Sequence, residues 1–310
     1  MARSLIVDCD PGVDDAIAIL LTLASPEELH LLGITTVAGN VPLALTQTNA
    51  RKICELAGRP DIPVFAGCPR PLLRPLETAR EVHGRTGLDG AALPAPTMPL
   101  QSQHAVAFLI EAISNSPEPI TIAAVGPLTN LAVAFIQAPQ IVENIAEIAI
   151  MGGAISQGNV TPSAEFNFYV DPHAADVVLK SGAKIALFTL DLTHQLVTAP
   201  ARLQAIRAID SPAAIAAADM LEFYGRFSMK RYGTAGGFLH DPCPIAYLIQ
   251  PQLFEGRSLS VELETLSDIT RGRAIVDLWG VTGRDANAVV MERADADGIY
   301  GLLCDRLRRL

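Results

Sequence analysis

The first fifteen residues hold four carboxylates at a spacing that could bind a metal ion. Asp8 and Asp10 end an apolar run, and Asp14 and Asp15 follow a Pro-Gly turn. Acidic residues at a helix N-terminus and a Pro-Gly turn are both ordinary, so Asp14 and Asp15 alone need no further explanation. Asp8 and Asp10, however, alternate on a strand, and at least one of them must face the loop that holds the other pair.

A hard divalent cation explains this cluster best. Four close carboxylates repel one another unless they are protonated or bind a cation, and no compensating Lys or Arg lies beside them in the sequence. Ca²⁺ tolerates irregular coordination by carboxylates and carbonyls, whereas Mg²⁺ requires octahedral geometry and usually a phosphate partner. We therefore expect a metal site here, with calcium as the ion.

A second group of polar residues follows a glycine-rich turn near residue 236. His240 and Asp241 precede Pro242 and an apolar helical pattern. A helix N-cap at Asp241 and proline in the first helical turn explain two of these three residues. They leave His240 unexplained, so a functional role for this segment and a purely structural one both remain open.

Two loops could contact the same ligand. In the loop 152–171, Glu165 and Asn167 would point the same way if the segment is extended, and with Asn159 they could bind a polyhydroxylated ligand. An ordinary loop with Asx turns is the simpler alternative. Around His83, three glycines within 82–90 suggest a mobile lid, although a solvated loop with an incidental histidine explains this pattern as well.

Alternating strands and helices are expected to carry these segments. The predicted strands are 4–9, 29–37, 62–66, 120–125, 147–151 and 184–190, followed by shorter ones at 258–264, 273–278 and 286–292. The predicted helices are 13–24, 42–57, 104–114, one that begins at Gly126-Pro127, 174–180, 199–209, 212–231, 242–250 and 294–308. This pattern indicates an α/β fold with a mainly parallel, open, Rossmann-like central sheet flanked by helices. We expect residues 1–310 to form a single domain, with its ligands beyond the carboxyl ends of the strands.

The composition excludes several classes of protein. Half of the 310 residues are hydrophobic, and a net charge of -10 argues against nucleic acid as a partner. The five cysteines are odd in number and form no CxxC pair, so we expect neither a disulfide framework nor a zinc site. The N-terminal apolar run is too short for a signal peptide, and no run is long enough to span a membrane. We therefore expect a cytoplasmic protein.

Taken together, these segments resemble the nucleoside hydrolase family, the inosine-uridine-preferring nucleoside N-ribohydrolases. The family's opening signature, DxDPGxDD, is present without a gap at residues 8–15. Further segments match in family order: Thr36-Val37-Ala38-Gly39-Asn40, His83-Gly84-Arg85-Thr86-Gly87-Leu88, Gly126-Pro127-Leu128-Thr129-Asn130, Met151-Gly152-Gly153, Glu165-Phe166-Asn167 and His240-Asp241-Pro242. The resemblance extends to about residue 250 and is weak by motif beyond it.

This resemblance implies roles for individual residues. The implied calcium ligands are Asp10, Asp15, Asp241 and the main-chain carbonyl of Val125. The implied ribose pocket contains Asp14, Asn40, Met151, Asn159, Glu165 and Asn167. Asp10 would also be the general base, and Asp8 would support the metal site from outside it. His83, His240 and Tyr232 would lie near the nucleobase, as in members that favour pyrimidine nucleosides; Ser228 departs from that group, which has a longer amide side chain there.

The implied reaction makes chemical sense for these residue types. Cleavage of an N-glycosidic bond passes through an oxocarbenium-like state, which requires an activated water, a fixed ribose and charge relief on the departing base. Asp10 would take the proton from a water whose pKa the calcium ion lowers, and His240 would protonate or polarise the base. We expect calcium-dependent hydrolysis of ribonucleosides to ribose and free base, with uridine and cytidine preferred and inosine as a possible further substrate.

Two alternatives belong to other classes of protein. Haloacid-dehalogenase-like phosphatases also place DxD after the first strand, but they need a later acidic pair, and the later strands here are followed by GPLTN, MGG and DLT. A non-catalytic nucleoside-binding protein is disfavoured by the crowded carboxylates and by the missing export signal. Release of free base, release of phosphate, or binding without turnover distinguishes the three. The resemblance further implies a homodimer or homotetramer.

Overall fold

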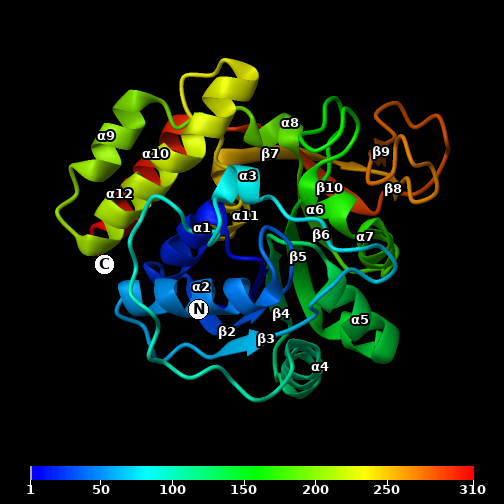
Figure 1. The fold of residues 1–310 in the computed structure, drawn as a ribbon. Helices are drawn as coiled ribbons and strands as arrows, with labels where there is room; N and C mark the ends of the chain where they lie inside the picture. Colours follow the sequence, from blue (N-terminus) through cyan, green and yellow to red (C-terminus); the bar gives the residue numbers. More distant parts are fainter. Residues whose placement is uncertain (1) are drawn as a thin grey trace.

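An eight-stranded sheet forms the centre of the computed structural model, which describes residues 2–310 (Figure 1). The strand order is β3-β2-β1-β4-β5-β6-β10-β7; β7 pairs antiparallel with β10, and the other pairs are parallel. These strands are β1 Arg3–Cys9, β2 Leu29–Thr36, β3 Val64–Ala66, β4 Ile120–Ala124, β5 Ile145–Met151, β6 Ile185–Phe188, β7 Phe254–Leu259 and β10 Ala288–Ala294. The sheet stays open at β3 and β7, which confirms the predicted α/β architecture.

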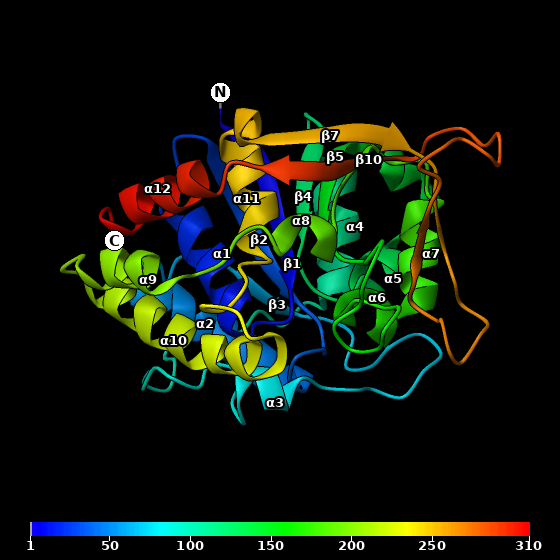
Figure 2. The same ribbon diagram turned by 90° about the horizontal axis from the view of Figure 1, so that it is seen from above.

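Helices cover both faces of the sheet (Figure 2). On one side lie α1 Val13–Leu23, α2 Leu43–Leu56, α9 Pro200–Arg207, α10 Pro212–Tyr232, α11 Pro242–Ile249 and α12 Ala296–Leu307. On the other lie α4 Ala105–Asn115, α5 Thr129–Gln137 and α7 Pro172–Leu179. Val7 packs into the first core and its neighbour Ile6 into the second, because successive side chains of a strand point to opposite faces. Burial on both faces explains why the strands are almost continuously apolar.

Parallel pairing brings the carboxyl ends of the central strands to one edge of the sheet. Asp8 of β1 lies opposite Thr35 of β2 and Ala124 of β4, and Ala124 lies opposite Ile150 of β5. The loops after these strands therefore begin side by side. Because β2 and β4 lie on opposite sides of β1, the connections diverge there, which is where open α/β sheets bind their ligands.

The structure corrects several predicted boundaries. Residues 258–264, predicted as one strand, belong to two: β7 ends at Leu259, and β8, Val261–Leu263, pairs with β9, Ala274–Val276, in a separate small sheet. Three short helices were not predicted: α3 Arg80–His83, α6 Phe166–Val170 and α8 Leu190–Thr193. Helices of four or five residues are too short for an apolar repeat to develop, so periodicity does not reveal them.

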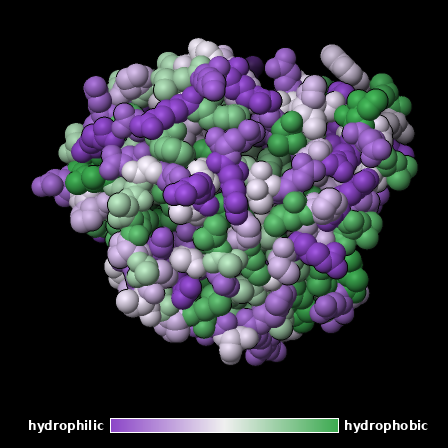
Figure 3. All heavy atoms as spheres, in the orientation of Figure 1, coloured by the Kyte–Doolittle hydropathy of each residue, from purple (hydrophilic) through white to green (hydrophobic). Residues whose placement is uncertain are grey.

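The small β8–β9 sheet and its flanking loops project from one edge of the molecule. They carry the most exposed large apolar side chains of the described residues: Leu266, Ile269, Trp279 and Val281, each at least 82% exposed. Over the rest of the face in Figure 3, hydrophobic and hydrophilic residues are interspersed. Within residues 2–310, no helix is both long and apolar enough to cross a membrane.

Candidate active site

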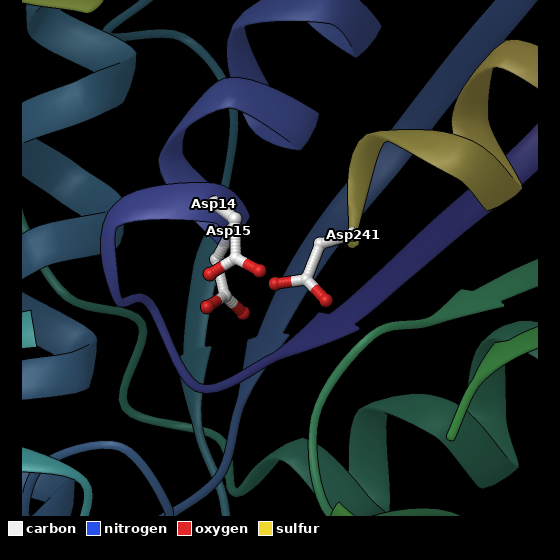
Figure 4. Close-up of side chains that lie close together, drawn as sticks. All are labelled: Asp14, Asp15 and Asp241. Atoms are coloured by element: carbon white, nitrogen blue, oxygen red, sulfur yellow. The ribbon is translucent and has the colours of Figure 1, made fainter. Parts of the chain in front are cut away.

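Three buried carboxylates meet at the carboxyl edge of the sheet (Figure 4). Asp14 and Asp15 project from the first turn of α1, and Asp241 comes from the residue before α11. Each offers an oxygen, and these oxygens all lie within 4.8 Å of one another. None of the three residues is more than 4% exposed. Packing of α11 against α1 thus adds Asp241 to the acidic segment at the N-terminus.

Asp10 lies beside this group, and its two oxygens have different surroundings. Oδ2 accepts the N–H of Asn40 at 2.6 Å, whereas Oδ1 is buried without a hydrogen-bond partner among the described residues. A Cβ at Gly39 would collide with Oδ2, and one at Gly126 would lie 2.6 Å from Oδ1. Only glycine therefore lets both backbone segments approach Asp10 so closely. The unpartnered Oδ1 is suited to binding a cation.

Burial raises the pKa values of the whole cluster, and neighbouring carboxylates add to this shift at Asp10, Asp14 and Asp241. Burial, reinforced by the charge of Asp15, raises the pKa of Asp14 to about 7. The same two causes raise the pKa of Asp10, and burial with the charges of Asp14 and Asp15 raises that of Asp241 well above its usual range. Nδ1 of His83 lies 3.9 Å from Asp14, but burial lowers the pKa of this histidine to about 3, so its ring is neutral and does not offset the negative charge. A divalent cation would neutralise these carboxylates, so the residues present fit a metal ion.

Asp241 is not a capping residue in the usual sense. It occupies the N-cap position of α11, but its side chain makes no capping hydrogen bond. By comparison, Asp171 accepts the N–H of Ala174 and caps α7. The interpretation of Asp241 as only a helix cap is therefore wrong, and its carboxylate is available to the acidic cluster.

A cavity of about 780 Å³, its open mouth included, adjoins the carboxylates. Its lining includes Asp14, Asn40, Val125, Met151, Asn159, Glu165 and Asn167, and we call this part its polar end. The structure thus brings together all the residues predicted for the ribose pocket. Asn167 Nδ2 donates to the carbonyls of Val125 and Met151, at 3.0 and 3.1 Å, and so connects the ends of β4 and β5. Oδ1 of Asn159 is buried without a hydrogen-bond partner among the described residues.

Glu165 lines this cavity, but its segment does not have the conformation that the sequence suggested. The segment is not extended: Glu165 is the N-cap of α6, and its carboxylate accepts the N–H groups of Asn167 at 2.8 Å and Gly153 at 2.9 Å. These bonds tie the start of α6 to the loop after β5. Burial raises the pKa of Glu165 to about 7, although the backbone donors oppose this shift.

Aromatic and imidazole rings form a second group in the lining of the cavity, connected by ring–ring contacts, and we call this part its ring-lined end. They belong to His83, His194, Tyr224, Phe227, Tyr232, Phe238 and His240, with Ser228 among them. His83 is buried at the end of α3, so its description as an incidental residue of a solvated loop is wrong. Its Nδ1 accepts the N–H of Val13 at 3.0 Å, and burial lowers its pKa to about 3. Nδ1 of His240 lies 2.6 Å from the hydroxyl of Thr193.

The short helix α8 and its C-cap residue contribute three contacts to the site that sequence analysis missed. Asp191 accepts the N–H of Ile155 at 2.8 Å and holds the loop that carries Asn159. Thr193 contacts His240, and His194 lines the ring-lined end of the cavity. Their position directly after a buried parallel strand was a signal that could have revealed them.

The remaining missed residues gave no comparable signal. Tyr224 and Phe227 lie within the long helix α10, where aromatic residues are usual in a core-facing stripe. Tyr224 is buried, and its ring lies 5.3 Å from that of His83 and 6.5 Å from that of His240, between centroids. Only the approach of α10 to α3 and to the segment before α11 shows that Tyr224 belongs to the cavity.

A cavity lined by acidic and amide groups together with a connected group of rings suits a ribose joined to a flat base. The sequence model of the inosine-uridine preferring nucleoside hydrolases matches residues 5–301. The chain belongs to this family. A relative from Shewanella sp. strain ANA-3, the pyrimidine-specific ribonucleoside hydrolase RihA, is 46% identical over 99% of this chain and 96% of its own length. A protein of the same name from Salmonella dublin is 43% identical over 99% of both chains.

Solved structures agree with this family assignment. A plant nucleoside hydrolase matches with a TM-score of 0.92 and 32% identity over 99% of both chains. A purine-preferring ribonucleoside hydrolase from Gardnerella vaginalis matches with a TM-score of 0.92 and 30% identity over 99% of this chain and 98% of its own. The protein is a nucleoside hydrolase, an enzyme that hydrolyses ribonucleosides, and not a phosphatase or a non-catalytic binding protein.

Proposed function

We propose that this nucleoside hydrolase prefers uridine and cytidine, cleaves inosine more slowly and depends on Ca²⁺. The observation that carries the base preference is the placement of His83 and His240 together at the ring-lined end of the cavity. Both offer imidazole groups where a pyrimidine leaving group needs a proton or a hydrogen bond. The pyrimidine-specific relatives from Shewanella and Salmonella, at 46% and 43% identity, support the same preference.

Calcium is the ion that this donor set favours. Asp10, Asp15, Asp241 and the carbonyl of Val125 would supply a mixed set of carboxylate and carbonyl oxygens, which Ca²⁺ accepts more readily than Mg²⁺. Once bound, the ion would supply Lewis-acid activation of a water molecule and neutralise the cluster. Asp10, with its unpartnered Oδ1, would accept the proton of that water as the general base. Asp14, in the same cluster, would bind a ribose hydroxyl.

The polar end of the cavity would hold the sugar in one orientation. All four polar residues Asn40, Asn159, Glu165 and Asn167 line the cavity. The side chains of Asn40, Glu165 and Asn167 are buried and hydrogen-bonded to the backbone, and the N–H of Asn159 donates to the carbonyl of Ala164. Such positioning lowers the entropy cost of reaching the transition state. At the ring-lined end, His240 would act on the departing base, with His83 as a hydrogen-bond donor and Tyr232 at the mouth.

The test is hydrolysis of uridine, cytidine, inosine and adenosine, followed as release of free base with Ca²⁺ and after EDTA treatment. We expect the highest kcat/KM for uridine and cytidine and loss of activity with EDTA that Ca²⁺ restores. A purine riboside that exceeds both pyrimidine ribosides would overturn the base preference. Full activity in EDTA would overturn the calcium dependence. We also propose a homodimer or homotetramer, which light scattering during size-exclusion chromatography tests.

A further inference from the structure

His194 lies at the ring-lined end of the cavity, although it belongs to none of the sequence motifs. It caps the C-terminus of α8, directly after Thr193, and lines the same cavity as His83 and His240. Its ring stacks on Phe238, with centroids 4.1 Å apart and an angle of 22° between the planes. Stacking of this kind fixes the plane of the imidazole.

The three histidines differ in what holds their ring nitrogens. Nδ1 of His83 accepts the N–H of Val13, and Nδ1 of His240 is paired with the hydroxyl of Thr193. Neither ring nitrogen of His194 makes a hydrogen bond within residues 2–310; its ring neighbours are Phe238, His240 at 5.8 Å and Tyr232 at 6.1 Å. No protein partner therefore selects one neutral tautomer of His194 over the other.

The two pyrimidines present opposite groups at the N3 position of the ring. Uracil has an N–H donor there, between two carbonyls, whereas cytosine has an acceptor beside its amino group. A side chain that could only donate, or only accept, at N3 would bind one of them and reject the other. A neutral imidazole has one donor and one acceptor nitrogen, and these exchange when the tautomer changes.

We propose that His194 is a specificity-determining residue that hydrogen-bonds the N3 edge of the bound pyrimidine, and that its free choice of tautomer lets uridine and cytidine bind alike. The inference rests on the proposed pyrimidine preference. Its geometric basis is a ring fixed in plane by Phe238 whose nitrogens have no protein partner. Burial also lowers the pKa of His194, although Asp191 opposes the shift, so the ring is neutral near neutral pH.

Steady-state kinetics of His194→Phe test this inference. Phenylalanine keeps the stacked ring but removes both nitrogens. We expect KM for uridine and for cytidine to rise by about 3- to 10-fold, the size of one hydrogen bond, with a smaller change in kcat. Turnover of p-nitrophenyl riboside, which has no pyrimidine edge, should fall much less. His194→Gln, which retains a donor and an acceptor, should recover part of the loss, and His30→Gln, on the exposed surface of β2, serves as the control variant.

3-Methyluridine gives a second, independent readout. Its methyl group blocks the N3 edge, so the wild type should discriminate against it relative to uridine, and His194→Ala should reduce that discrimination. Equal losses on uridine and p-nitrophenyl riboside, or unchanged KM values in His194→Phe, would overturn the role of His194 while leaving the proposed function intact. A wild type that favours purine ribosides over both uridine and cytidine would overturn the proposed function and this inference together.

Discussion

The N–H of Val13 donates a 3.0 Å hydrogen bond to Nδ1 of His83. Val13 opens α1, and Asp14 and Asp15 follow it directly, so one helical turn positions both the carboxylate cluster and the ring of His83. With Nδ1 occupied as an acceptor, the neutral imidazole carries its hydrogen on Nε2 and can only donate to a substrate.

Replacement of His83 should therefore remove one hydrogen bond and no proton transfer. We expect His83→Ala to lower kcat/KM for uridine by about 3- to 10-fold. p-Nitrophenyl riboside should be affected less, because its phenolate leaves without help. A loss as large as that of His240→Ala on uridine would show that His83 supplies the proton after all.

Loss of His240 should have a larger effect, because general acid catalysis contributes about 10²–10⁴-fold. His240→Ala should lower kcat for uridine by a factor in that range and p-nitrophenyl riboside turnover much less. Calcium content, measured by atomic emission, should not change, since the imidazole is not proposed as a ligand. Thr193→Val, which removes the hydroxyl 2.6 Å from Nδ1, should act in the same direction more weakly. Equal losses on both substrates would show that His240 shapes the site and does not act as the general acid.

Asp10→Asn should remove both a metal ligand and the general base. We expect activity on uridine to fall by several orders of magnitude and the calcium content of the purified protein to drop. Asp8→Asn is the matched control: the Asp8 carboxylate bonds to Thr35 and Asn130 at 2.5 and 2.8 Å, outside the cluster, so much more activity should remain. Zinc in the purified wild type would contradict the calcium assignment.

The ribose should be recognised more strictly than the base. Asp14, Glu165 and Asn167 form a buried polar set. Oδ1 of the half-buried Asn159 has no hydrogen-bond partner among the described residues, so a missing hydroxyl would leave the polar groups of this pocket incompletely paired. Sites built to bond a hydroxyl reject the analogue that lacks it by up to about 10⁴–10⁵-fold. 2′-Deoxyuridine should accordingly be a very poor substrate in the uridine assay. Comparable kcat/KM values for the two would show that this loop does not bind the 2′-hydroxyl.

Stabilisation by calcium should increase with pH. Carboxyls of the unfolded chain lose their protons near pH 4, but the pKa values of Asp14 and Glu165 in the folded, metal-free protein are raised to about 7. Between these pH values the folded state binds more protons than the unfolded one, so the stability of the metal-free protein falls as pH rises through this window. A cation would replace the bound protons at the cluster. The increase in Tm on adding Ca²⁺ should therefore grow from about pH 5 to about pH 7 and then level off; Asp241→Asn should show a smaller increase throughout.

Local patterns were enough to find much of the fold and part of the site. Because β1 and α1 are buried along most of their length, their apolar residues are nearly continuous, and the parallel α/β sheet follows from such runs. Asp10, Asp14 and Asp15 are neighbours in sequence as well as in space, so their crowding without a nearby cation is visible before folding. The segments of the family motifs also follow strands, where open sheets bind ligands.

Only the tertiary structure decided how distant segments meet and which atoms remain free. Asp241 joins Asp15 because α11 packs on α1, and the absence of a capping bond at Asp241 shows only in its side-chain conformation. The difference between His83 and His194 is likewise set by whether a donor from another element reaches a ring nitrogen. The sequence determined which groups are present and which turns carry them. The charge, the tautomer and the orientation of each group depend on its hydrogen bonds and its burial. Hydrogen bonds and burial in turn depend on contacts between residues far apart in the chain.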